Sequence, residues 1–217
     1  MMMNLFSVFD PCTGTMSLNW LSSIMFVALP SKMWMSPSKI STIFNKICMM
    51  MFKEMNSLTK NKSINLITIS LFLMILINNI MGLMPYVYTS SAHLVFSLTM
   101  ALPLWISMMM FGWMNLPNKM LAHLVPTGTP SMLMPFMVMI ETISNVIRPG
   151  SLSVRLSANM IAGHLLMSLL GNNMVNSTIV MSMLMWLCIL LLLFESAVAM
   201  IQAYVFMTLS TLYSSEI

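Results

Sequence analysis

Acidic, basic and histidine side chains interrupt the apolar stretches 131–171 and 174–213 at five positions: Glu141, Arg148, Arg155, His164 and Glu195. An ionisable group within a membrane segment costs about 2.5 kcal/mol or more, so such groups face protein or water and mark a pathway. A carboxyl or an imidazole exchanges protons, whereas an arginine stays charged even in a low dielectric. These residue types therefore predict a proton or ion path beside a permanent positive charge.

The helix face that contains Arg155 is otherwise small and polar. Asn159, Ala162 and Gly163 follow it by four, seven and eight residues. Small residues let another helix come close, so we expect Arg155 to attract a carboxylate on a passing partner. His164 lies nine residues on, about 180° around a helix, and should line a different surface.

Two further pairs of polar residues share a spacing of seven. Glu195 and Gln202 form a second polar stripe on the last apolar segment. Glu141 and Arg148 either belong to the path or form a satisfied ion pair near the polar end of their segment. Pro149-Gly150 predicts a kink between Arg148 and Arg155.

The composition excludes a soluble enzyme, because 59% of the 217 residues are hydrophobic and only 6% are charged. Six of the nine basic residues fall between Lys32 and Lys62, which indicates membrane topology and not nucleic-acid binding. The three cysteines are scattered, and no His or Cys accompanies the methionines at ligand spacing. No glycine-rich phosphate loop is present. We expect no metal, no cofactor and no ATP-hydrolysing site in this chain.

Hydropathy predicts an all-α membrane protein with five membrane-embedded helices and one surface helix. Membrane spans are expected at 11–29, 64–84 and 92–116, because each approaches the ~20 residues that cross a bilayer. The stretches 131–171 and 174–213 are each about 60 Å long as helices, roughly twice the hydrocarbon core. They therefore predict a long, strongly tilted helical hairpin.

The segment 37–60 has the pattern of an amphipathic helix. Apolar residues recur at helical spacing: Ile40, Ile43, Phe44, Ile47, Met51, Phe52 and Met55. Lysines recur every seven residues on another stripe: Lys39, Lys46, Lys53 and Lys60. Either the helix lies on a membrane surface or it packs on another subunit. The lysines before 64–84 and Lys119 after 92–116 place these loops in the cytoplasm or the mitochondrial matrix, with the N-terminus opposite.

With these elements in place, residues 155–164 (RLSANMIAGH) resemble the signature of subunit a of the rotary ATP synthase. Other matching motifs are NLFSVFDP at 4–11, ALPLW at 101–105, HLVPTGTP at 123–130, PFMVMIETIS at 135–144, and residues 195–202 with 204–206. Together they resemble the invertebrate mitochondrial form over essentially the full chain.

The resemblance implies a proton-translocating stator subunit in the mitochondrial inner membrane. Its implied partners are a ring of proteolipid c subunits, other membrane-sector and peripheral-stalk subunits, and the lipid bilayer. The N-terminus would face the intermembrane space and the lysine-rich helix the matrix. Arg155 matches the arginine that faces the ring carboxylates between two half-channels, and Glu141 the acidic residue near the matrix exit. The other matched path residues are Asn159, His164, Glu195 and Gln202. Arg148 is a departure, because the family does not reserve this position for arginine.

Two other classes of protein remain as alternatives from the residues alone. A secondary transporter also places ionisable groups at mid-membrane, but it usually has internal repeats or broken helices. A structural membrane anchor explains the hydropathy but leaves Arg155 and Glu195 unpaired in a costly place.

Overall fold

The computed structural model describes residues 5–14, 16–28, 36–59, 62–125, 130, 132–173 and 178–216. These residues form helices and no strand, as the sequence predicts. The short 3₁₀-helices are η1 (Leu5–Phe9), η2 (Leu18–Ala28) and η3 (Ser90–Ala92). The α-helices are α1 (Lys39–Leu58), α2 (Lys62–Gly82), α3 (Leu94–Asn115), α4 (Pro117–Leu124), α5 (Met134–Asn173) and α6 (Thr178–Glu216).

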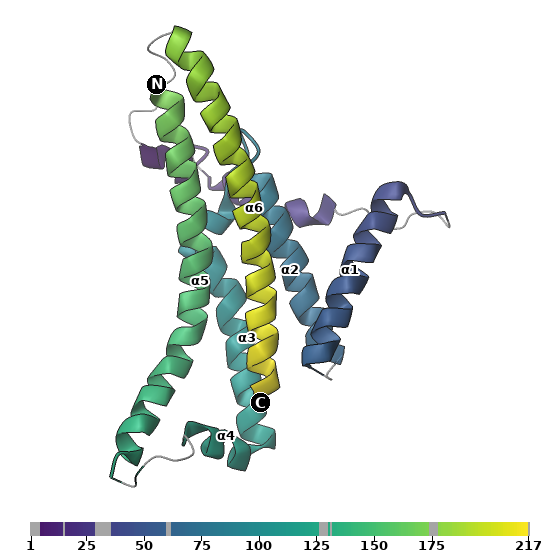
Figure 1. The fold of residues 1–217 in the computed structure, drawn as a ribbon, viewed down its shortest axis with the longest axis vertical. Coiled ribbons are helices and arrows are strands. Elements are labelled where there is room, and N and C mark those ends of the chain that lie inside the picture. Colours follow the sequence, from purple (N-terminus) through teal and green to yellow (C-terminus); the bar gives the residue numbers. More distant parts are fainter. Residues whose placement is uncertain are drawn as a thin grey trace.

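Four helices, α2, α3, α5 and α6, run along the long axis of the molecule (Figure 1). Helix α2 packs beside α6, and α3 packs beside α5. The end of α5 and the start of α6 lie toward one end of the bundle, as do the short helices η1 to η3. Helix α4 and the C-terminus lie toward the other end. The apolar core forms where α6 meets its neighbours, and it includes Leu156, Ala203, Phe206 and Met207.

Among the residues that the structure describes, three helices are long and apolar enough to cross a membrane: Ser63–Gly82, Leu94–Asn115 and Met181–Ser215. The first two coincide closely with the spans expected at 64–84 and 92–116. The segment expected at 11–29 contains only η2, with 11 residues. At about 2 Å per residue, η2 is about 22 Å long, shorter than a bilayer core. The total of five membrane-embedded helices stays a prediction.

The amphipathic segment forms α1, which begins at Lys39 because Ser38 caps its first turn. The Ser38 side chain accepts a hydrogen bond from the Ser41 N–H at 3.2 Å. Near the other end of α1, Met55 is fully buried in the core. Glu54 also accepts a hydrogen bond from the Tyr204 hydroxyl on α6 at 3.4 Å.

Apolar and lysine side chains of α1 are both exposed. Ile40, Ile43 and Ile47 are exposed although they are apolar. Lys39, Lys46 and Lys53 are exposed as well, while Lys60 lies outside the described residues. A membrane surface and another subunit both stay open as the cover of this apolar stripe.

The last two helices form the predicted long pair, with 40 residues in α5 and 39 in α6. Residues 174–177, where the sequence predicts the turn, are outside the described residues. Helix α5 continues through Pro149 and changes direction in its first half (Figure 1). A proline removes one backbone hydrogen bond, which accounts for a bend without a break. The tilt of the pair in the membrane stays a prediction.

Candidate functional site

The carboxylate of Glu195 on α6 lies directly against Gly163 on α5. A Cβ atom added at position 163 would be 2.6 Å from Cδ of Glu195 and 2.8 and 2.9 Å from its two oxygens. Cβ atoms essentially never come within 3.0 Å of other heavy atoms, so with any other residue at position 163 the Glu195 carboxyl would have to move. The small-residue pattern around Arg155 therefore has a specific purpose at this position.

Glu195 is 9% exposed, and neither of its carboxyl oxygens has a hydrogen-bond partner within the described chain. A buried polar group without a partner costs free energy, and a buried charge without one costs much more. Water or a proton must therefore satisfy this group. Such a carboxyl is suited to exchanging a proton.

Glu195 opens onto a cavity of about 640 Å³ between α5 and α6. Asn79 from α2, Asn159 from α5 and Gln202 from α6 contribute its other polar side chains, and the rest of the wall is mainly apolar. A water molecule needs about 30 Å³ in the liquid, so the cavity has room for a chain of waters. Both side-chain polar atoms of Asn79 and Nε2 of Gln202 are buried without a protein partner, and water in the cavity would satisfy them.

Two of the predicted site residues are joined across the helices. The Asn159 amide donates a hydrogen bond to Oε1 of Gln202 at 3.0 Å. This bond links α5 and α6 one turn beyond Arg155 and places both amides in the wall beside Glu195. The sequence predicted both residues but not their pairing.

Asn79 is the residue of the cavity that the sequence analysis missed. Its side chain is fully buried, and it adds α2 as a third wall. The signal was present, because Asn78-Asn79 is a polar pair inside an otherwise uncharged span. Periodicity could not show that this pair faces the Glu195 cavity.

Arg155 lies on the exposed surface of α5, one residue before a cavity-lining leucine, Leu156. None of the described carboxylates forms an ion pair with it. This is the arrangement expected of an arginine that attracts the carboxylate of a moving partner.

His164 lies apart from the Glu195 cavity. Its ring contacts Phe9 of η1 edge to face, with ring centroids 6.3 Å apart and an angle of 86° between the rings. Its Nε2 atom is buried and has no partner among the described residues. The structure therefore places His164 on a separate surface of α5 from Arg155, beside the N-terminal segment.

Glu141 and Arg148 form a second polar site near the start of α5. Their side chains make an ion pair at 3.8 Å, as one interpretation of their spacing predicted. The Arg148 guanidinium also lies 5.0 Å from the ring centroid of Tyr213, near the end of α6. This cation–π contact ties the end of α6 to α5.

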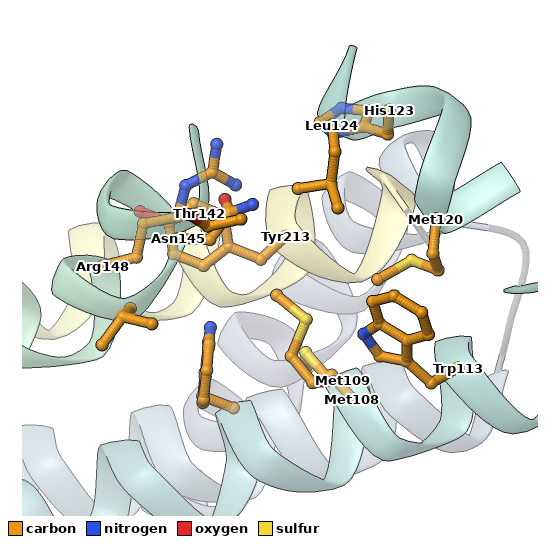
Figure 2. Close-up of a pocket in the computed structure, with 12 residues that line it drawn as sticks. Met108, Met109, Trp113, Met120, His123, Leu124, Thr142, Asn145, Arg148 and Tyr213 are labelled. Carbon is orange, nitrogen blue, oxygen red and sulfur yellow. The ribbon is translucent and has the colours of Figure 1, made fainter. Parts of the chain in front are cut away.

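A smaller cavity of about 200 Å³ lies beside this second site, between α3, α4, α5 and α6. Figure 2 shows Thr142, Asn145 and Arg148 of α5 with Tyr213 on one side of it, and His123 and Leu124 of α4 on another. Met108, Met109 and Trp113 close it from α3 (Figure 2). Its charged lining is Arg148, so this end of the path contains a cation where the Glu195 cavity contains an acid.

The geometry thus divides the path residues into two sites, with Arg155 between Glu141 and Gly163 along α5. Residues 2–215 match the family model described as ATP synthase A chain. The chain belongs to this family.

ATP synthase A chain relatives from insects match over their full length. The ATP synthase subunit a of Locusta migratoria is 54% identical over 226 residues, with all of both chains covered. The subunits of Aedes albopictus and Drosophila melanogaster are each 55% identical, over 225 and 223 residues, again with full coverage. The resemblance to the invertebrate form is therefore confirmed.

Membership of the ATP synthase A chain family also agrees with the three apolar helices. Together they show a multi-pass membrane protein. The family supports a part in ATP synthesis and proton transport within a membrane sector.

Proposed function

We propose that this chain is the proton-translocating stator subunit of an ATP synthase and that it provides two offset half-channels. Protons would load onto and leave from the carboxylates of a ring of proteolipid c subunits, so that proton flow is coupled to rotation and ATP synthesis. The proposal is carried by a buried carboxyl on α6 and an exposed arginine on the adjacent helix α5. The buried Glu195 carboxyl borders a mainly apolar cavity and has no hydrogen-bond partner among the described residues, and the exposed Arg155 forms no ion pair with the described carboxylates.

Glu195 is the proposed relay on one side of Arg155. Asn159 and Gln202 hold the two helices together beside it and orient water in the cavity. His164 would deliver protons toward this site from the N-terminal end of the bundle. A proton relay needs a group that gains and loses protons readily, and both carboxyl and imidazole groups do so.

Arg155 is the proposed electrostatic gate. A proton that crosses the full potential gains about 2.3 kcal/mol per 100 mV. This energy can drive rotation only if no continuous proton path joins the two sides of the membrane. A fixed positive charge repels protons between the half-channels and attracts each deprotonated ring carboxylate as it arrives. An arginine suits this task because it does not lose its own proton.

Glu141 is the proposed exit on the other side of Arg155. It is partly exposed and faces Arg148, so it would pass protons from the ring to water. The charge pattern suggests which compartment each side faces. The lysines of α1 and Lys119 lie on the side proposed as the mitochondrial matrix, and the N-terminus lies toward the intermembrane space.

The proposed partners are the proteolipid ring, the other membrane-sector and peripheral-stalk subunits and the lipids of the mitochondrial inner membrane. Co-purification distinguishes this proposal from its alternatives. A stator subunit travels with a proteolipid ring, whereas a secondary transporter is active alone. A structural anchor would keep full activity after Arg155→Gln.

The direct test is Arg155→Ala in inner-membrane vesicles that contain the assembled complex. We expect passive proton leak through the sector together with loss of ATP synthesis, because the two half-channels are no longer separated. Collapse of an imposed pH gradient, followed with a fluorescent dye, measures the leak. Lys119→Ala is the matched control, because it removes an exposed positive charge outside the path. Vesicles of Arg155→Ala as tight as the wild type would contradict the proposal.

A further inference from the structure

A third cavity, of about 710 Å³, lies where α2 ends and the N-terminal segment crosses the bundle. Its lining is more polar than that of the other two, and it comes from η1, η2 and the loop after α2. The polar residues in it are Ser7, Asp10, Cys12, Asn19, Ser22, Tyr86 and Tyr88. Asp10 is the acidic residue of this lining. We call this cavity the N-terminal vestibule.

Helix η1 forms the wall between the vestibule and α5. Ser7, Val8 and Asp10 line the vestibule, while the ring of Phe9 turns the other way and meets His164. Successive residues of a 3₁₀-helix point about 120° apart, so one short segment can face both sides. Phe9 thus connects the segment that lines the vestibule to the His164 imidazole.

Phe9 is also anchored on its inner side. It packs against a small buried cluster formed by Ala92, Met160 and Ala199. Ala199 lies one turn beyond Glu195 on α6, and both line the Glu195 cavity. The packing of Phe9 therefore joins the N-terminal segment to the helices that hold the relay.

An aromatic cluster packs around Tyr88, which lines the vestibule. The hydroxyl of Tyr88 is hydrogen-bonded to Nε2 of His93, and their rings stack with centroids 5.5 Å apart. Trp20 of η2 lies 5.3 Å from the His93 ring. Burial, and then the nearby Asp10 carboxylate and Cys12 thiol, raise the pKa of Tyr88 to about 12. Tyr88 thus stays protonated at neutral pH, and its hydroxyl brings no negative charge to the vestibule.

We propose that the N-terminal vestibule is the aqueous mouth of the half-channel that leads to His164 and Glu195. Asp10 raises the local concentration of hydronium there, and Phe9 is a positioning residue that holds the His164 imidazole against the vestibule wall. This inference rests on the proposed function. Lys119 lies on α4, at the other end of the bundle from the short helices (Figure 1), and Asp10 is the charged residue among those that line the vestibule.

Cys12 offers a natural probe of the vestibule, because it lines the cavity and is exposed. In closed vesicles with the assembled complex, a positively charged methanethiosulfonate reagent is applied to the face that bears the N-terminus. We expect proton-driven ATP synthesis to fall about fivefold or more, because a fixed cation in the mouth repels hydronium. The Cys12→Ser variant should not respond to the reagent, which excludes labelling at Cys48 or Cys188. Complete labelling of Cys12 with no change in rate would overturn the inference.

Asp10→Asn tests the electrostatic part. We expect proton flux to fall about threefold at low ionic strength and the difference to fade in high salt, because mobile ions screen an exposed charge. Asp10→Glu should restore the flux. Equal flux in Asp10→Asn and wild type at low salt would show that Asp10 does not attract protons to the mouth.

Two variants of Phe9 distinguish the effect of its aromatic ring from the effect of its size. Phe9→Leu keeps an apolar side chain but loses the aromatic edge, so proton flux should fall about threefold, the size of one aromatic contact. It should also change the pH dependence of the flux, which a purely structural role would not do. Phe9→Tyr keeps the ring and should recover most of the flux. Phe6→Ala is the matched control, because Phe6 belongs to the same helix but is 67% exposed.

The outcomes for Phe9 and for the proposed function are distinguishable. If Phe9→Leu and Phe6→Ala behave alike in flux and pH profile, Phe9 does not position His164. If the vestibule variants have no effect while Arg155→Ala leaks protons, the vestibule inference fails and the stator function stands.

Discussion

Two acidic side chains of the α5–α6 pair, Glu141 and Glu195, lie in opposite surroundings. Glu195 is 9% exposed and has no partner within the described chain, and it borders a cavity of about 640 Å³. The side chain of Glu141 is 31% exposed and forms an ion pair with Arg148 at 3.8 Å. Arg155 lies between these two regions along α5.

Under the proposed function, the carboxyl group would serve two different purposes at these two sites. A lone carboxyl in a largely apolar wall needs a proton or water at all times, which suits transfer to and from a protonated partner. An exposed carboxylate beside a guanidinium is already satisfied as an anion, which suits release of protons to water. The asymmetry between the two half-channels would thus come from burial and pairing.

The largest expected effect comes from Glu195→Gln. The amide fills the same space but cannot exchange a proton at neutral pH, so proton flux should fall about a hundredfold. Glu141→Gln, measured in the same vesicles by collapse of a pH gradient, should have a much smaller effect because water reaches that site. Equal losses of proton flux in the two variants would contradict the proposed difference between the Glu195 and Glu141 sites.

Gly163→Ala should have the next largest effect. The new Cβ would lie 2.6 Å from Cδ of Glu195, which forces the carboxyl out of its position. The carboxyl is the end of a flexible side chain and can move at low cost, but once it has left its place in the cavity we expect proton flux to fall about tenfold. Gly171→Ala in the same helix is the control, because a Cβ there meets nothing within 4 Å. A Gly163→Ala complex with normal flux would show that the close approach is not required.

A moderate effect is expected from Gln202→Leu, which removes the acceptor of the Asn159 amide. The lost hydrogen bond between α5 and α6 is worth about 1 kcal/mol, so flux should fall about fivefold. Gln202→Glu keeps an acceptor at the same place and should lose less. The ranking of the two variants, read from rates of ATP synthesis, separates the hydrogen bond from the volume of the side chain.

The smallest effect is expected from Arg148→Gln. A partly exposed ion pair contributes only about 0.2–1 kcal/mol, so flux should fall by about threefold or less. Tyr213→Leu removes the cation–π contact, and Tyr213→Phe keeps it. If Arg148→Gln abolishes flux as completely as Glu195→Gln, the Glu141 region is as strictly organised as the Glu195 region and the contrast is lost.

Much of the fold follows from local patterns in the sequence. Residues 178–216 contain no glycine and no proline, and they form one uninterrupted helix, α6. The amphipathic pattern of 37–60 likewise produced α1, although its start lies at Lys39 and not at Pro37. The segment 11–29 differs most, because its apolar composition does not specify how the backbone winds, and 3₁₀ geometry makes η2 short.

The sequence predicted residues of the candidate site but not their contacts, because these contacts join segments that lie far apart in the chain. Asn159 and Gln202 were identified by their spacing, but their hydrogen bond joins residues 43 apart in sequence. His164 was expected on a different surface from Arg155, yet its neighbour Phe9 comes from the other end of the chain.

The sequence by itself determined that this chain is helical and membrane-embedded, to which family it belongs and which residues are ionisable within the apolar segments. Hydropathy and helical periodicity are local properties, so they require no knowledge of the neighbouring helix. Only the tertiary structure decided that Gly163 admits the Glu195 carboxyl, that Asn79 completes its cavity and that Glu141 faces Arg148 beside Tyr213. Periodicity specifies the face of a helix, whereas the packing of distant segments specifies what lies opposite that face.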